Sequence, residues 1–216
     1  LPRGQYLPWL ERDARWLTEA MRTEPPLVGT FPAAFRGDDP RPGDNVQALY
    51  GVLGLAAAQD AGLALDTDAW RAVDFHWRRV QQRTPGDQPA GWARGFYNLT
   101  DDVRQRLPGN LGDELEADGP PDPLMTAAGS LALDLAQRQL GPPETRRGPT
   151  LPPGASGDEL DKGLDWLDQR FTVDVAGKAD FEWYYRMWLV PQLGLSTGIR
   201  RFNGVDWVRD VTDAWR

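Results

Sequence analysis

The chain has 216 residues, one histidine, no cysteine and a formal net charge of −8. This length suffices for one sizeable domain with its own core. The missing cysteines exclude disulfides, thiolate catalysis and Cys-ligated zinc or iron–sulfur centres. The negative charge argues against nucleic acid as a partner, and no apolar run is long enough to predict a transmembrane segment.

The N-terminal part of the chain predicts two helices. Residues 5–22 carry apolar side chains at helical spacing, and a Pro-Pro pair ends the pattern. Residues 44–62 are apolar nearly all round, which predicts a buried helix that begins at Asp44 or Asn45 and ends at Gly62. The glycines inside this second helix favour a close helix–helix contact.

A third helix is predicted over residues 67–83, capped by Thr67 or Asp68. Its apolar stripe consists of Trp70, Val73, Trp77 and Val80. Residues 84–122 are rich in proline, glycine and acidic side chains, so we expect a long loop excursion with a short helix near residues 100–106.

The second half of the chain predicts four more helices, over residues 123–140, 158–171, 180–194 and 205–216. Pro191 should bend or end the last turn of the helix predicted over residues 180–194. The composition of residues 141–157 predicts a flexible linker. Half-polar and apolar helices alternate along the chain, and no strand pattern competes with them.

Four segments, centred on Trp16, Trp77, Trp166 and Trp207, share a tryptophan near the start of a polar, helix-compatible stretch. A recurring helical unit suggests stacked hairpins, because one hairpin cannot bury its own apolar face. We therefore predict an all-α fold of helical-hairpin repeats, with residues 1–216 forming a single domain.

Three segments resemble the prenyltransferase and squalene-oxidase repeat family, and in particular the bacterial repeat proteins of planctomycete type. They are DNVQALYGVLGLAAAQDAGLALDTDAWRAVDFHWRRVQQ (44–82), PLMTAAGSLAL (123–133), and the pattern WYY…G…TG…G…DW within 160–210. The resemblance implies an alpha-alpha toroid, the architecture of terpene cyclases. The chain offers fewer hairpins than a closed toroid has, so a partial or open ring is implied.

The catalytic signatures of the resembling enzymes are not found. A terpene cyclase of this type uses an Asp-x-Asp-Asp acid, whereas Asp66-Thr67-Asp68-Ala69 lacks the last aspartate. We interpret Asp66 and Asp68 as helix caps. The zinc site of the protein prenyltransferases uses Asp, Cys and His, which cannot be assembled here. We therefore expect no cofactor and no metal. The missing signatures favour a protein without enzymatic activity over an enzyme.

Several aromatic and charged residues are candidates for binding a ligand. Aromatic side chains on the inner wall of a toroid can stack on a sugar ring or stabilise a cation or polyisoprenoid, although ordinary helix packing competes with this interpretation. The candidate ligand-binding residues are Trp183, Tyr184, Tyr185, Trp188, Trp92 and Arg200. If the chain is an enzyme, the candidate catalytic residues are Asp66, Asp68, Asp74 and Tyr184, with Asp134 as a further acid. His76 is expected to be a packed or surface histidine rather than a general base.

The leading functional hypothesis is a non-catalytic, toroid-type binding or assembly subunit that contacts a protein partner through tryptophan-rich surfaces. A larger complex is compatible with it, and so is a small apolar or glycan ligand. The alternative is a terpene-cyclase-like or polysaccharide-lyase-like enzyme that uses an inner-wall acid and aromatic residues. The absence of an initiator methionine and the Trp- and Pro-rich composition favour a secreted or periplasmic location.

Overall fold

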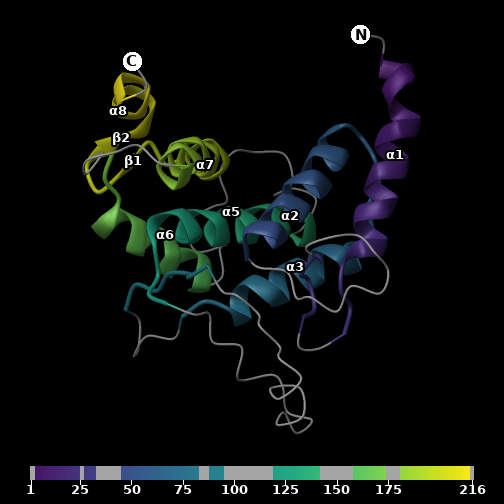
Figure 1. The fold of residues 1–216 in the computed structure, drawn as a ribbon, viewed down its shortest axis with the longest axis horizontal. Coiled ribbons are helices and arrows are strands. Elements are labelled where there is room, and N and C mark those ends of the chain that lie inside the picture. The colour runs from purple at the N-terminus through teal and green to yellow at the C-terminus, as the bar shows by residue number, and fades with distance from the viewer. Residues whose placement is uncertain are drawn as a thin grey trace, which may run out of the picture.

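A computed structural model describes residues 3–24, 27–32, 45–82, 88–94, 119–141, 158–173 and 181–214. Over these ranges the chain is predominantly helical, which confirms the expected all-α character (Figure 1). The helices are α1 (Arg3–Ala20), α2 (Asn45–Asp60), α3 (Thr67–Arg79), α5 (Pro123–Leu140), α6 (Asp158–Arg170), α7 (Phe181–Thr197) and α8 (Trp207–Ala214). Two short strands, β1 (Arg201–Phe202) and β2 (Val205–Asp206), pair antiparallel between α7 and α8.

Helix α5 occupies the centre of the molecule. It packs against α2, α3, α6 and α7, and most of its residues are buried. In Figure 1, α7 lies above α5 and α3 lies below it. Helix α1 stands at one side of the molecule, where it packs on α2. One cluster of buried apolar side chains runs through all these elements, from Ala20 to Val211.

Aspartate side chains cap the N-termini of α3 and α5. Asp122 caps α5, where its carboxylate accepts a hydrogen bond from the Met125 amide at 2.9 Å and Pro123 occupies the first turn. Asp66 caps α3 by accepting from the Asp68 amide at 2.9 Å. The predicted role of Asp66 as a cap is confirmed. The prediction that Thr67 or Asp68 caps this helix is wrong, because both residues lie within its first turn.

Helix α2 ends at Asp60, and Gly62, the predicted terminating residue, follows it with a positive φ of 96°. The amide of Gly62 bonds to the carbonyl of Gln59, and the amide of Leu63 bonds to the carbonyl of Ala58. This pair of bonds is a Schellman motif, whose left-handed residue favours glycine. The start of α2 differs from the prediction for Asn45, because its side chain is buried and bonds to other segments instead of capping the helix.

Trp92 joins three parts of the core. Its ring lies against Gly163 of α6 and against Gly129 of α5, where an added Cβ would collide with the indole. Its Nε1–H donates to the carbonyl of Trp77 at 2.8 Å. Trp92 has no exposed surface, so the segment around it packs inside the molecule although it lies in the predicted loop excursion.

The end of the chain differs from the prediction in two ways. Helix α7 continues past Pro191 to Thr197, so the proline does not end it. Residues 205–206, predicted as helical, instead form β2 of a small hairpin. Asn203 and Gly204 both have positive φ, as the two central residues of a type I′ turn require. An Asn-Gly pair is a strong hairpin signal, and it overrides helical continuation here.

Most of the predicted excursion, the short helix near residues 100–106 and nearly all of the predicted linker at 141–157 lie outside the described residues. Among the helices that the structure describes, none combines the length and the apolar character that crossing a membrane requires.

Candidate functional site

The aromatic face consists of Tyr50 on α2 and Tyr184, Trp188 and Leu195 on α7. These side chains are 51%, 52%, 38% and 61% exposed, respectively. Positions 184, 188 and 195 recur at helical spacing and therefore share one side of α7. Large apolar side chains that gather on a surface mark an interaction site more often than isolated ones do.

A stack of three rings fixes part of this face. The ring of Tyr50 lies 5.6 Å from that of Tyr185 and is nearly parallel to it, at 11°. Tyr185 in turn stacks on Trp188 at 5.7 Å and 13°. Tyr185 is buried, so the stack anchors the two exposed rings to the body of the protein. Helices α2 and α7, both packed on α5, are thereby linked across their outer surfaces.

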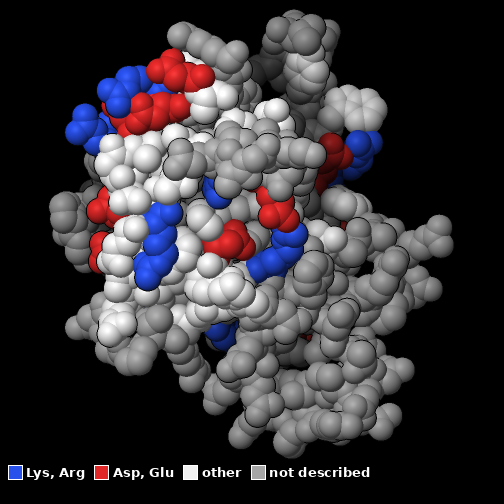
Figure 2. Space-filling model, turned by 60° about the vertical axis from the view of Figure 1, so that its left-hand side comes forward, with Lys and Arg blue, Asp and Glu red and all other residues white. Residues whose placement is uncertain are grey.

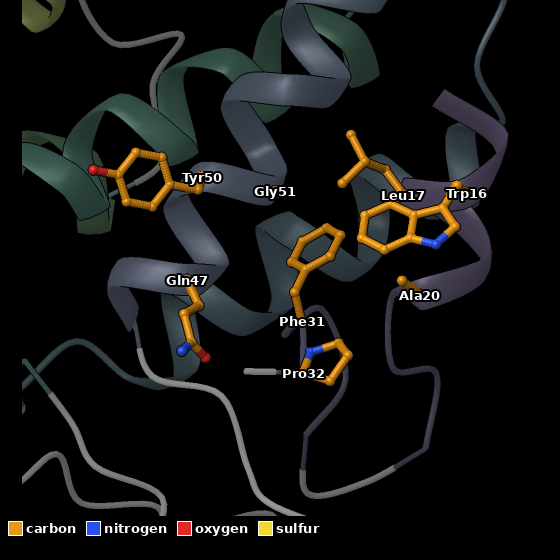
Figure 3. Close-up of a pocket in the computed structure, with 8 residues that line it drawn as sticks. All are labelled: Trp16, Leu17, Ala20, Phe31, Pro32, Gln47, Tyr50 and Gly51. Atoms are coloured by element: carbon orange, nitrogen blue, oxygen red, sulfur yellow. The ribbon is translucent and has the colours of Figure 1, made fainter. Parts of the chain in front are cut away.

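An apolar pocket of about 240 Å³ lies between α1 and α2, next to the aromatic face (Figure 3). Its lining consists of Trp16, Leu17, Ala20, Phe31, Pro32, Gln47, Tyr50 and Gly51. Phe31 and Gly51 are buried, whereas Trp16 and Tyr50 are exposed. Because Tyr50 belongs to both, the pocket and the aromatic face adjoin each other.

Close contacts between glycines and large side chains shape this region. The Phe31 ring lies directly over Gly51, and Leu17 of α1 approaches Gly54 of α2. A Cβ at Gly54 would lie 2.6 Å from Leu17 Cδ1. The prediction that the glycines of this helix permit close packing is confirmed.

The polar groups next to α7 are engaged with one another. Ser196 donates a hydrogen bond to the carboxylate of Asp134, which also forms an ion pair with Arg138 at 2.8 Å. Arg94 and Glu182 form an ion pair of 2.6 Å at the start of the helix. Asp134 is buried, and its contacts with Ser196 and Arg138 are both made by its carboxylate.

The predicted ligand-binding residues separate into exposed and buried ones. The structure places Tyr184 and Trp188 on the aromatic face and Tyr185 beneath it, whereas Trp183 is buried and Trp92 belongs to the core. Trp183 contacts Tyr184 edge to face, with ring centroids 4.9 Å apart.

Arg200 lies in the hairpin region, where its Nε donates to the carboxylate of Asp206 at 2.9 Å. This hydrogen bond is the main cause that lowers the pKa of Asp206. Desolvation opposes it, and a hydrogen bond from the Arg209 amide adds to it. Asp206 also caps α8, because its carboxylate accepts from Arg209 while Asp210 accepts from the amide of Asp206. Arg200 therefore contacts an element of local structure.

Acidic and basic side chains are interspersed on the face that Figure 2 shows. On α8, Arg209 pairs with Asp210 at 2.6 Å. A surface that binds nucleic acid instead carries a patch of one positive sign. On this face the visible charges are of mixed sign.

The acids proposed for an enzyme are not brought together with Tyr184. Asp66 and Asp68 are exposed at the start of α3, and Asp68 pairs with Arg71 at 2.6 Å. Asp74 pairs with Arg78 at 2.8 Å. All three belong to the α3 side of α5, whereas Tyr184 is on α7 at the opposite side (Figure 1).

His76 is fully buried beside α2. Its Nε2 lies 3.0 Å from Asn45 Oδ1, and Asn45 Nδ2 donates to the carbonyl of Ala93 at 3.0 Å. Because the Asn45 amide group points its NH₂ at a carbonyl, its oxygen faces the imidazole, so Nε2 carries the proton. Burial, reinforced by nearby Arg79, lowers the pKa of His76 to about 3. The expectation of a packed histidine is confirmed.

The described residues contain no group of three or more His, Asp or Glu side chains placed to hold a metal ion. No match is found when the chain is compared with protein-family models, with curated proteins and with solved structures.

Sequence reasoning did not predict the exposed position of Tyr50, the pairing of Asn45 with His76 or the pocket. Tyr50 is one aromatic residue in an otherwise apolar helix. Its exposure and its stacking on Tyr185 of α7 become visible only in the folded structure. The signal that was available is the pair Gly51 and Gly54, which indicates that another segment lies close to that side of α2.

Proposed function

We propose that the chain is a non-catalytic binding or assembly protein that uses the aromatic face to dock an apolar surface of a protein partner. The observation that carries this proposal is the row Tyr184, Trp188 and Leu195 on one side of α7, continued by Tyr50 on α2. Tyrosine and tryptophan are enriched among the residues that dominate binding energy at protein interfaces.

The chemistry of the face favours a protein over a sugar. Leu195 is the most exposed of the large apolar side chains in the described residues, and an aliphatic group offers no planar surface for stacking. The nearby polar groups Ser196, Asp134 and Arg138 are occupied by one another, whereas sugar recognition needs donors and acceptors directed outward.

A toroid-like arrangement is part of the same proposal. The helices α2, α5 and α7 contact each other in a row, with α5 between the other two. Helices α3 and α6 pack on α5, and α8 packs on α7, as a second layer would. Two successive helix pairs, α5–α6 and α7–α8, pack together, and α2 and α3 both pack on α5. This arrangement supports an open arc of hairpins, as the resemblance to the prenyltransferase and squalene-oxidase repeat family implies. The aromatic face would then belong to the layer of the first helices.

The test is partner dependence on the aromatic face. A photoreactive phenylalanine analogue is introduced at Trp188 or, as a matched control, at Phe75, which is 49% exposed on α3. In cells that contain the natural partner, we expect a discrete heavier adduct from position 188 and none from position 75. The double variant Tyr184→Ser/Leu195→Ser should reduce adduct formation at position 188.

Native mass spectrometry of the purified protein provides the second measurement. The proposal requires a complex heavier than the 24.1 kDa chain that survives in Phe75→Ser and is lost in Trp188→Ser. A chain that stays monomeric in its source cells, with equal crosslinking from positions 75 and 188, would overturn it.

A further inference from the structure

The pocket between α1 and α2 is a second candidate site. We propose that it binds a small, uncharged aromatic molecule of one or two fused rings with a single polar group. This inference is independent of the proposed protein partner, because the pocket lies beside the aromatic face and shares only Tyr50 with it.

The size of the pocket sets the size of the ligand. Its volume is about 240 Å³. An apolar cavity of about 150 Å³ is enough to hold benzene in another protein. The larger volume here accommodates a second fused ring, whereas drug-sized ligands fill pockets of roughly 300 Å³ and above.

The lining sets the chemical class of the ligand. Seven of its eight residues are apolar or aromatic, and Gln47 contributes the amide that Figure 3 shows at one side. Among the described residues the lining contains no charged side chain, so an ionised ligand would lose hydration without gaining a counter-charge from them. The rings of Trp16 and Phe31, which lie side by side in Figure 3, offer aromatic surfaces against which a planar ligand can stack or meet edge to face.

The pocket is lined at its base by residues that the fold holds in place. Phe31 is 5% exposed and rests on Gly51, and Ala20 is also buried. Trp16 and Tyr50 are exposed at its rim. A larger side chain at position 20 would occupy the space that the small alanine leaves.

The experiment is ligand-observed saturation-transfer NMR on the full chain with indole, its carbocyclic analogue indene and the cation tryptamine. We expect indole to bind with a Kd on the order of a millimolar or tighter. Tryptamine should bind at least about tenfold more weakly, because the described lining residues offer no counter-charge.

Variants assign the binding to this pocket. Ala20→Leu should remove the indole signal, whereas Glu19→Leu adds the same side chain to an exposed position of the same helix and should keep it. Trp16→Ala changes an exposed residue, so it tests the rim without disturbing the core and should weaken indole binding severalfold. Gln47→Leu should abolish the preference for indole over indene.

Three results would overturn the inference. They are the absence of saturation transfer to indole from the folded wild-type chain, equal binding by the Ala20→Leu and Glu19→Leu variants, and binding of tryptamine as tight as that of indole.

Discussion

The buried His76 makes the stability of this protein sensitive to mild acid. It is the only histidine of the chain, so its contribution can be isolated. In the unfolded chain its pKa is about 6.5, whereas burial lowers the folded pKa to about 3. Between these values the unfolded state binds a proton that the folded state does not. Stability is therefore complete above about pH 6.5 and is lost as the pH falls towards 3.

The magnitude follows from the difference between the two pKa values. Each pH unit below the unfolded pKa removes about 1.4 kcal/mol from the free energy of unfolding. From pH 8 to pH 5 the loss from His76 is about 2 kcal/mol, a large share of the roughly 5–15 kcal/mol that stabilises a typical domain. Ordinary carboxylates titrate mainly below pH 5 and contribute little in this interval.

The informative variant is His76→Gln, which can still donate to Asn45 Oδ1 but cannot be protonated. Urea unfolding at pH 8 and pH 5 should show a fall of about 2 kcal/mol for the wild type beyond any fall in the variant. The C2 proton of the single imidazole, followed by NMR, should not titrate in the folded protein above pH 5. Equal losses in both proteins, or an imidazole midpoint near 6.5, would refute the reasoning.

Three further changes test the packing and the caps. Gly129→Ala places a Cβ against the Trp92 indole, so the free energy of unfolding in urea should fall by at least about 1–3 kcal/mol. An unchanged midpoint would contradict the packing of Trp92 between α5 and α6. Asp122→Ala should cost about 1 kcal/mol by removing a cap, whereas Asp122→Asn keeps the cap. Burial raises the pKa of Asp122, so its ionisation opposes folding as the pH rises, and the asparagine variant should equal or exceed the wild type at pH 8. Gly204→Ala strains a residue at φ 75° and should lower the thermal midpoint, with Asn203→Gly as the tolerated control in the same turn.

Helix positions were predictable where local signals agreed. The predicted helix 123–140 coincides with α5 (Pro123–Leu140), because an aspartate cap, a proline in the first turn and a long apolar body all indicate the same element. The end of α2 just before Gly62 and the apolar stripe of α3 were predictable for the same reason. The Asn203-Gly204 pair is also a local hairpin signal, which the predicted helix 205–216 does not take into account.

The candidate site was harder to predict from the sequence, because it is formed by segments that are far apart in the chain. Trp183 and Tyr184 are adjacent in the sequence, yet one is buried and the other is 52% exposed, according to which side of α7 faces the core. The pairing of Asn45 with His76 joins residues 31 positions apart, and the stack of Tyr50 on Tyr185 joins α2 to α7. No local pattern specifies such contacts, since helical periodicity defines faces but not their neighbours.

The positions of the exposed tryptophans favour the proposed interaction surface over a simple effect of a tryptophan-rich composition. Those on α3, α6 and α8 are buried, and so are Trp92 and Trp183. The exposed tryptophans among the described residues are Trp9 and Trp16 on α1 and Trp188 on α7. Trp16 lines the pocket and Trp188 belongs to the aromatic face. If exposure merely followed from a tryptophan-rich composition, the helices packed on the other side of α5 would expose some as well. Among the described residues, two of the three exposed tryptophans therefore lie at the pocket and the stacked rings, and the proposed binding role accounts for their exposure.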